Sequence, residues 1–170
     1  GSGGPAAGEL GKVEVVRIED DAQAVGSLRA AQAVVVRPEV SGRIVKLGFT
    51  DGARVRRGQL LVQLDDTLQD AQLKQAQAQS RIAMTNLQRS RELQAQNFVS
   101  QSAVDQNAAA LEVAQAQVAL ARAQLQRLVI LAPFDGVAGI RGVALGDYLK
   151  DGADIVTLED RSRMWVDFRL

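Results

Sequence analysis

Apolar and polar residues alternate in short runs in the first third of the chain, and the spacing of apolar residues becomes helical in the middle. The runs at 13–18, 22–28, 33–36, 43–47 and 60–64 have the length and turn-rich borders of strands. A period of two is typical of strands that bury one face. The sequence therefore predicts a small β structure that begins near residue 13.

The central segment predicts two long helices. Residues 59–132 contain neither glycine nor proline. Asp66 has the position of an N-cap, with Gln69 three residues later as its capping-box partner. The first helix is expected over about 67–97 and the second from 101 or 102 to about 128. The link at 98–100 is too short for anything but an antiparallel turn.

Heptad spacing predicts that these helices pack along an apolar seam. The spacing is clear in the second helix and weaker in the first, and small residues fill many of the remaining seam positions. Such a pattern indicates coiled-coil packing. The expected seam residues are Leu73, Leu87, Val104, Leu111, Val118 and Leu125. A rival interpretation is a self-associating coiled-coil protein whose helices pair between chains.

Eight glycines form two sets of four with the same spacing. The sets are Gly42, Gly48, Gly52 and Gly58, and Gly136, Gly142, Gly146 and Gly152. A repeated half-unit that cannot bury its apolar face alone must pair with its copy. We expect turns with positive φ at Gly48, Gly52 and Gly58. The predicted fold class is α+β, a flattened β-sandwich built from two sequence halves and interrupted by a long antiparallel helical hairpin.

Composition excludes several classes of function. The chain carries 20 basic and 20 acidic residues, so no net charge attracts nucleic acid. It contains no cysteine and no histidine, which removes thiol catalysis, the usual proton shuttle and the commonest metal ligand. No catalytic constellation, cofactor motif or metal site is recognisable, and no apolar run reaches the length of a membrane span. We therefore expect a protein that is not an enzyme and has no cofactor.

Four segments together resemble one family. They are VRPEVSGRI at 36–44, GARVRRGQLL at 52–61, APFDG at 132–136 and MWVDF at 164–168. The chain resembles the periplasmic adaptor subunits, or membrane fusion proteins, of tripartite efflux pumps of the resistance-nodulation-division type. The resemblance implies a lipoyl-like domain at 33–66 and 129–160, a helical hairpin at 67–128 and β-barrel fragments at 13–32 and 161–170. Residues 1–12 read as a linker or tag remnant.

The resemblance also assigns three residues to the hairpin tip. Family members that meet a TolC-like channel share an arginine, a leucine four residues later and a serine seven after that. Arg89, Leu93 and Ser100 match this spacing. The resemblance implies that they contact the channel. The alternative is structural: Ser100 caps the second helix, Leu93 packs in the hairpin and Arg89 pairs with Glu92.

The function implied by the resemblance is that of an adaptor in the periplasm of a Gram-negative bacterium, with the native protein anchored to the inner membrane. It would form a homo-oligomer, a hexamer in the assembled pump. It would link an inner-membrane efflux transporter to an outer-membrane channel protein and so export small toxic compounds. Adaptors for type I protein secretion and for heavy-metal efflux remain as alternatives.

Overall fold

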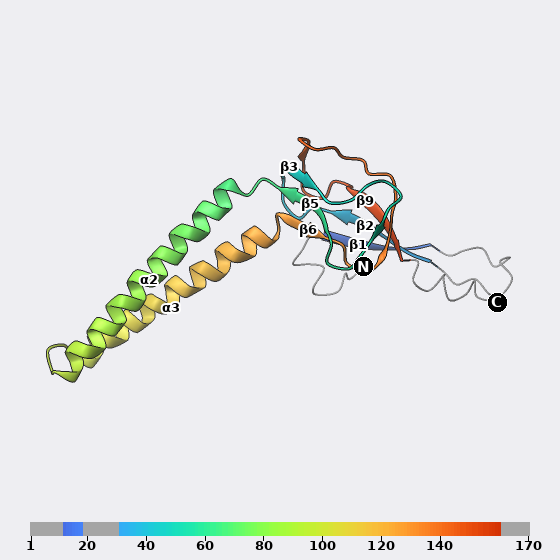
Figure 1. Cartoon of the computed structure of the whole chain (residues 1–170). Coiled ribbons are helices and arrows are strands. Elements are labelled where there is room, and N and C mark those ends of the chain that lie inside the picture. The colour runs from blue at the N-terminus through green and yellow to red at the C-terminus, as the bar shows by residue number, and fades with distance from the viewer. Residues whose placement is uncertain (1–11, 19–30, 161–170) are drawn as a thin grey trace. The chain divides into compact units, whose positions relative to one another are not determined.

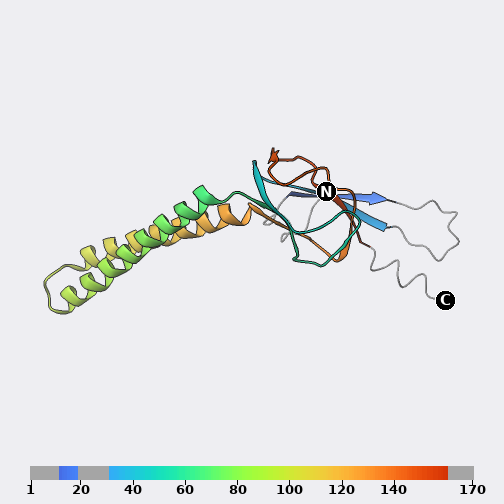
Figure 2. The same cartoon turned by 45° about the horizontal axis from the view of Figure 1, so that its top comes forward.

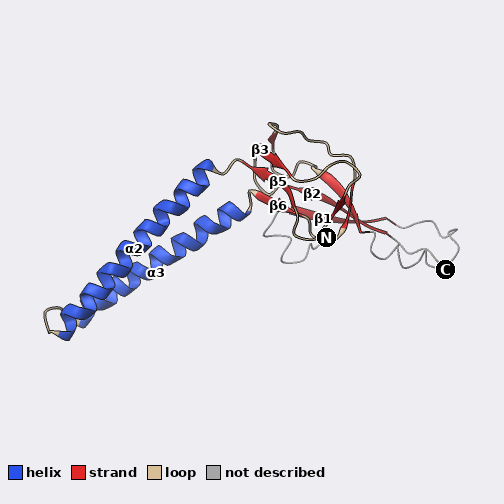
Figure 3. Cartoon of the chain, viewed as in Figure 1, coloured by secondary structure: helices blue, strands red, loops and turns tan. Residues whose placement is uncertain are grey.

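The computed structural model describes residues 12–18 and 31–160 (Figure 1). The chain divides into two compact units, one from Gly1–Asp65 with Gln126–Leu170 and the other from Asp66–Leu125. Within the described residues the first unit is built from strands and the second from helices (Figure 3). They are called here the β unit and the hairpin unit.

Nine strands of the described part of the β unit form two antiparallel sheets. One sheet has the order β1-β2-β9-β7-β4 and the other β6-β5-β3-β8. The strands are β1 (Lys12–Ile18), β2 (Ala31–Arg37), β3 (Gly42–Leu47), β4 (Arg54–Val55), β5 (Leu60–Leu64), β6 (Val129–Leu131), β7 (Gly136–Ala138), β8 (Tyr148–Leu149) and β9 (Val156–Asp160). The strand expected at 22–28 and the barrel fragment at 161–170 lie outside the described residues. The assignment of 13–32 to a β-barrel stays a prediction.

Strand pairing interleaves the two sequence halves. The short strand β4 of the first half pairs with β7 of the second, and β8 of the second pairs with β3 of the first. Hydrogen bonds repeat with the same offset: the Gly58 N–H donates to Ala132 O at 2.8 Å, and the Gly152 N–H donates to Pro38 O at 2.8 Å. Each half therefore completes the sheet of the other.

The core of the β unit draws on both halves. Its largest fully buried side chains include Ile44, Leu61 and Leu64 from the first half and Ile155 and Leu158 from the second. Burial of each such side chain contributes about 1.5–3 kcal/mol relative to exposure. Neither half could bury these side chains without the other.

The glycines meet two different requirements. Gly52, Gly58, Gly146 and Gly152 have φ of 73°, 83°, 90° and 78°. The prediction of positive φ at Gly48 is wrong. A Cβ at that position would lie 2.0 Å from the Leu60 carbonyl oxygen, so Gly48 is required by the close approach of two backbone segments and not by its dihedral angle.

The hairpin unit consists of α2 (Thr67–Ala95) and α3 (Gln101–Gln126), which lie side by side within one chain (Figures 1 and 2). Asp66 precedes α2, and its carbonyl accepts the Asp70 N–H at 2.8 Å. Its carboxylate makes no capping hydrogen bond, so the capping-box prediction is wrong. The reason is conformational: with φ of −114° and ψ of 10°, Asp66 is outside the β-region conformation from which cap side chains reach the backbone.

Both helices end two residues before the predicted boundary. Asn97 has φ of 62°, which stops α2. The Asn97 N–H donates to Gln94 O and the Phe98 N–H to Leu93 O, each at 2.8 Å, which is the hydrogen-bond pattern of a Schellman motif. At the other boundary Leu128 belongs to the β unit, where it is 2% exposed and its carbonyl accepts the Leu64 N–H.

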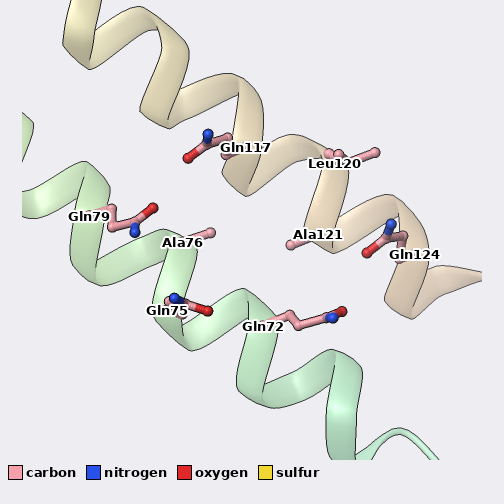
Figure 4. A pocket seen from close by; sticks show the side chains of 8 residues that line it. All are labelled: Gln72, Gln75, Ala76, Gln79, Gln117, Leu120, Ala121 and Gln124. Carbon is pink, nitrogen blue, oxygen red and sulfur yellow. The ribbon is translucent and has the colours of Figure 1, made fainter.

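Small and apolar residues fill the contact between α2 and α3. The buried residues are Ala76, Leu87 and Ser90 on α2 and Val104, Leu111, Ala114 and Ala121 on α3. The predicted seam residues Leu73, Val118 and Leu125 are half-buried. Farther from the tip, Ala76 and Ala121 face each other across a groove lined mainly by glutamines (Figure 4). Coiled-coil packing along the full length stays a prediction.

Candidate functional site: the hairpin tip

The hairpin tip is the turn at 96–100 with the adjoining turns of α2 and α3. It exposes a large aromatic side chain, since Phe98 is 70% exposed. The left-handed conformation of Asn97 and the two hydrogen bonds that close α2 fix the backbone beneath Phe98. An apolar ring is thus presented to solvent on a backbone that is held by hydrogen bonds.

Polar side chains brace the same turn. Ser100 Oγ accepts the Ala103 N–H at 3.2 Å and so caps the first turn of α3. Gln94 Nε2 donates to Gln101 Oε1 at 2.6 Å, which joins the two helices, and Gln101 Nε2 donates to Asp105 Oδ1 at 2.8 Å. Side-chain hydrogen bonds therefore connect α2, the turn and α3 at the tip.

An apolar cluster supports the tip from below. Leu87, Val104 and Leu111 are buried together, and the half-buried Val99 packs against them. Val99 ties the link itself to the helices, because it is a link residue with its side chain in this cluster. Such a support holds the exposed tip residues in place.

The structure brings the three predicted contact residues to this end of the hairpin. The Arg89 side chain is exposed and, among the described residues, has neither a hydrogen bond nor an ion pair, so the alternative pairing with Glu92 is not seen. Leu93 is half-buried, and its carbonyl oxygen accepts the N–H groups of Gln96 and Phe98 in the turn. Ser100 is exposed and acts as a helix cap. Contact of these residues with a channel stays a prediction.

Two residues of the tip were missed from the sequence. Asn97 carries a recognisable signal, because asparagine is the commonest substitute for glycine just after a helix. Phe98 follows Asn97 in the short link, where a solvated turn would need no aromatic ring. The helical pattern extends the first helix through Asn97 and leaves Phe98 in the link, so neither residue is predicted as part of a site.

The side chains at the tip suit recognition and not catalysis. They offer a guanidinium, amides, a hydroxyl and an aromatic ring. Within the described ranges, no cluster of acidic residues could hold a metal ion, and no helix has the length and apolarity of a bilayer span.

The pKa of Lys74, on the exposed side of α2, lies above its ordinary value because the ammonium donates a hydrogen bond to Asp70 and is attracted by its charge.

The family model for the barrel-sandwich hybrid domain of RND membrane fusion proteins matches residues 32–158. The chain belongs to this family. The match includes both sequence halves of the β unit and the whole hairpin between them. The family is one of efflux adaptors, and no catalytic family is indicated.

Three proteins illustrate the similarity of this membrane fusion protein to others in sequence or structure. An uncharacterised protein of Haemophilus influenzae is 35% identical over 145 residues, which are 85% of this chain and 38% of the relative. The solvent efflux pump periplasmic linker SrpA of Pseudomonas putida is 43% identical over 53 residues, or 31% of this chain and 14% of SrpA. A crystallised MacA–MexA chimera with the hairpin domain of Pseudomonas aeruginosa MexA has a TM-score of 0.72 and 26% identity, covering 89% of this chain and 52% of the chimera. The chain thus spans about half or less of the length of these relatives.

Proposed function

We propose that this chain is the channel-facing part of a periplasmic adaptor in a Gram-negative bacterium. The adaptor joins an inner-membrane efflux transporter to a TolC-like outer-membrane channel and serves the export of small toxic compounds. It acts as a homo-oligomer, a hexamer in the pump, and is anchored to the inner membrane. The family match and the name of the P. putida solvent-pump linker support this assignment.

The braced tip is the observation that carries the proposal. A helical hairpin with exposed Arg89 and Phe98 toward its end, and with no acidic cluster that could hold a metal ion among the described residues, is suited to contact another protein. Arginine and aromatic residues are enriched among the side chains that dominate the energetics of protein interfaces. The tip would insert between helical ends of the channel, with Arg89 supplying a hydrogen-bonding cation and Leu93 the apolar edge of the contact.

The test uses the full-length adaptor in a strain that lacks its own copy. We expect Arg89→Ala and Leu93→Ala each to abolish drug resistance and capture of the outer-membrane channel while leaving expression and melting temperature unchanged. Truncation of an arginine that is a hot spot of an interface weakens binding by about 2 kcal/mol or more. Arg122→Ala, which removes an exposed arginine from α3, is the matched control. Wild-type resistance from both tip variants, at normal expression, would contradict the proposal.

A further inference from the structure

The link between α2 and α3 exposes the larger of its two apolar side chains. Phe98 is 70% exposed, whereas the neighbouring Val99 is half-buried and packs against the apolar cluster below the tip. Burial of a phenylalanine removes more apolar surface from water than burial of a valine, and would stabilise the hairpin more. The exposure of Phe98 therefore does not serve the stability of the isolated hairpin.

The backbone that carries Phe98 is fixed before any partner binds. The Phe98 N–H donates to Leu93 O at 2.8 Å, and Ser100, two residues later, caps α3 through its hydroxyl. A phenylalanine side chain has only two torsions to order, so binding through a ring on such a backbone loses little conformational entropy. Single exposed apolar residues are common on protein surfaces. Its fixed presentation at the end of the hairpin distinguishes Phe98 from them.

The end of the hairpin carries no charged side chain. No acidic or basic residue occurs at 93–104, called here the neutral cap, and the nearest charged residues along the chain are Glu92 and Asp105. The side chains of Gln96 and Asn97, which precede the ring in the chain, are exposed and make no hydrogen bond in the part of the chain that the structure describes. Each of their amides can both donate and accept hydrogen bonds. The neutral cap therefore combines an exposed ring with free, uncharged hydrogen-bonding groups.

This combination defines the chemistry of the surface that fits the neutral cap. An aromatic side chain contributes most to an interface when a pocket removes it from water. The amides beside it then lose water too and need hydrogen-bond partners. A charged group in that pocket would be buried without a counter-charge, because the neutral cap supplies none. The fitting surface is an apolar pocket with an uncharged polar rim, and the free N–H and C=O groups at the ends of helices can form such a rim.

We propose that Phe98 is the apolar anchor of the tip. Its ring enters an apolar pocket between helix ends of the outer-membrane channel, and the amides of Gln96 and Asn97 pair with backbone groups that those helix ends leave free. Arg89 and Leu93 contact the channel beside this pocket. The inference rests on the proposed function and adds to it the anchoring residue and the chemistry of the pocket that receives it.

Substitutions of Phe98 in the full-length adaptor test the anchor. The TolC-like channel of the same strain is purified in detergent and immobilised, and the dissociation constant of each adaptor variant is measured. We expect Phe98→Ser to weaken capture about 30-fold, the ratio that the 2 kcal/mol threshold of an interface hot spot produces. Phe98→Leu keeps an apolar side chain and should bind about tenfold more tightly than Phe98→Ser.

Leu68→Ser is the matched control, because Leu68 is 64% exposed and lies in the first turn of α2, at the other end of this helix. We expect this control to capture the channel like the wild type. Capture by Phe98→Ser within about threefold of the wild type would overturn the proposal. An equal loss in the Leu68→Ser control, or a Phe98→Leu variant as weak as Phe98→Ser, would overturn it as well.

Two further measurements separate an apolar contact from a structural or electrostatic effect. Phe98→Ser should melt like the wild type in circular dichroism, because most of the ring is in solvent. Its loss of capture should be the same in about 0.1 M and about 1 M salt, although the Debye length falls from about 10 Å to about 3 Å. A lowered melting temperature, or a loss that disappears at high salt, would overturn the neutral apolar pocket.

Other occupants of this surface are tested without the channel. Vesicles of outer-membrane lipid that retain the wild type but not Phe98→Ser would assign the ring to lipid and overturn the proposal. A weaker self-association of Phe98→Ser in sedimentation equilibrium would assign it to a second copy, with the same consequence. If Arg89→Ala and Leu93→Ala lose capture while Phe98→Ser keeps it, this inference fails and the proposed function stands. Wild-type capture by all three variants contradicts both.

Discussion

Single positions in the repeated halves face different physical demands although their sequence spacing is the same. Gly48 and Gly142 are equivalent in the repeat. The Gly48 N–H donates to Leu61 O in β5, and the Gly142 N–H donates to Ile155 O, one residue before β9. A Cβ at position 48 would collide with the Leu60 carbonyl oxygen at 2.0 Å, whereas at position 142 the nearest atom, Asp154 O, is 3.9 Å away. The duplication has therefore kept glycine at one site where an alanine would fit.

This difference predicts unequal effects of the same substitution. We expect Gly48→Ala to lower the free energy of unfolding by about 3 kcal/mol, because backbone must move to relieve the overlap. Gly142→Ala should change it by less than about 0.5 kcal/mol, as is usual for unstrained surface sites. Urea unfolding of both variants measures the difference. Equal destabilisation would show that the close approach at Gly48 is wrong.

The helical elements show how far the sequence could predict the structure. The heptad pattern gave the right residues for the buried part of α3, because Val104 and Leu111 are large and apolar and have one way to be buried. It was weaker for α2, where the contact is made largely by alanine and serine, which carry little periodic signal. The predicted helix ends were wrong by two residues because they depend on one dihedral angle at Asn97 and on the burial of Leu128 in the β unit.

The left-handed residue at the end of α2 gives a prediction for this element. Asn97→Gly should leave the hairpin as stable or slightly more stable, because glycine adopts φ of 62° without strain. Asn97→Val should lower the stability by about 1–2 kcal/mol, the usual excess cost of the left-handed region for a residue with a branched side chain. Thermal unfolding followed by circular dichroism compares the two. A valine variant that melts with the glycine variant would mean that the turn has another conformation.

At the scale of the whole molecule, the repeat of glycines predicted that the halves belong together but not how they interlock. The exchange of β4 and β8 between sheets concerns strands of two residues each, too short to leave a pattern in the sequence. The sequence signal at Phe98 likewise did not predict a site by itself, because the position of Phe98 at the tip depends on the fold of both helices.

The β unit should survive without the hairpin. Leu64 and Leu128 are joined by a 2.8 Å hydrogen bond inside the β unit, so residues 66–126 can be replaced by a short Asn-Gly turn. We expect this variant to unfold cooperatively with dispersed amide resonances and to lose all capture of the channel. An unfolded variant would show that the helices are required for the β unit to form.

The exchange of strands between distant halves has a consequence during synthesis. At about 5–20 residues per second, β3, β4 and β5 leave the ribosome several seconds before β7 and β8, the strands of the second half that pair with β4 and β3. Until then the nascent first half has sheet edges without partners, which are exposed to aggregation. Early packing of α2 against α3 would bring Leu64 and Leu128 together. It would thereby shorten the loop that must close when β7 and β8 pair with the first half. The helices of the hairpin unit would then act first by shortening the path over which the two halves of the β unit must find each other.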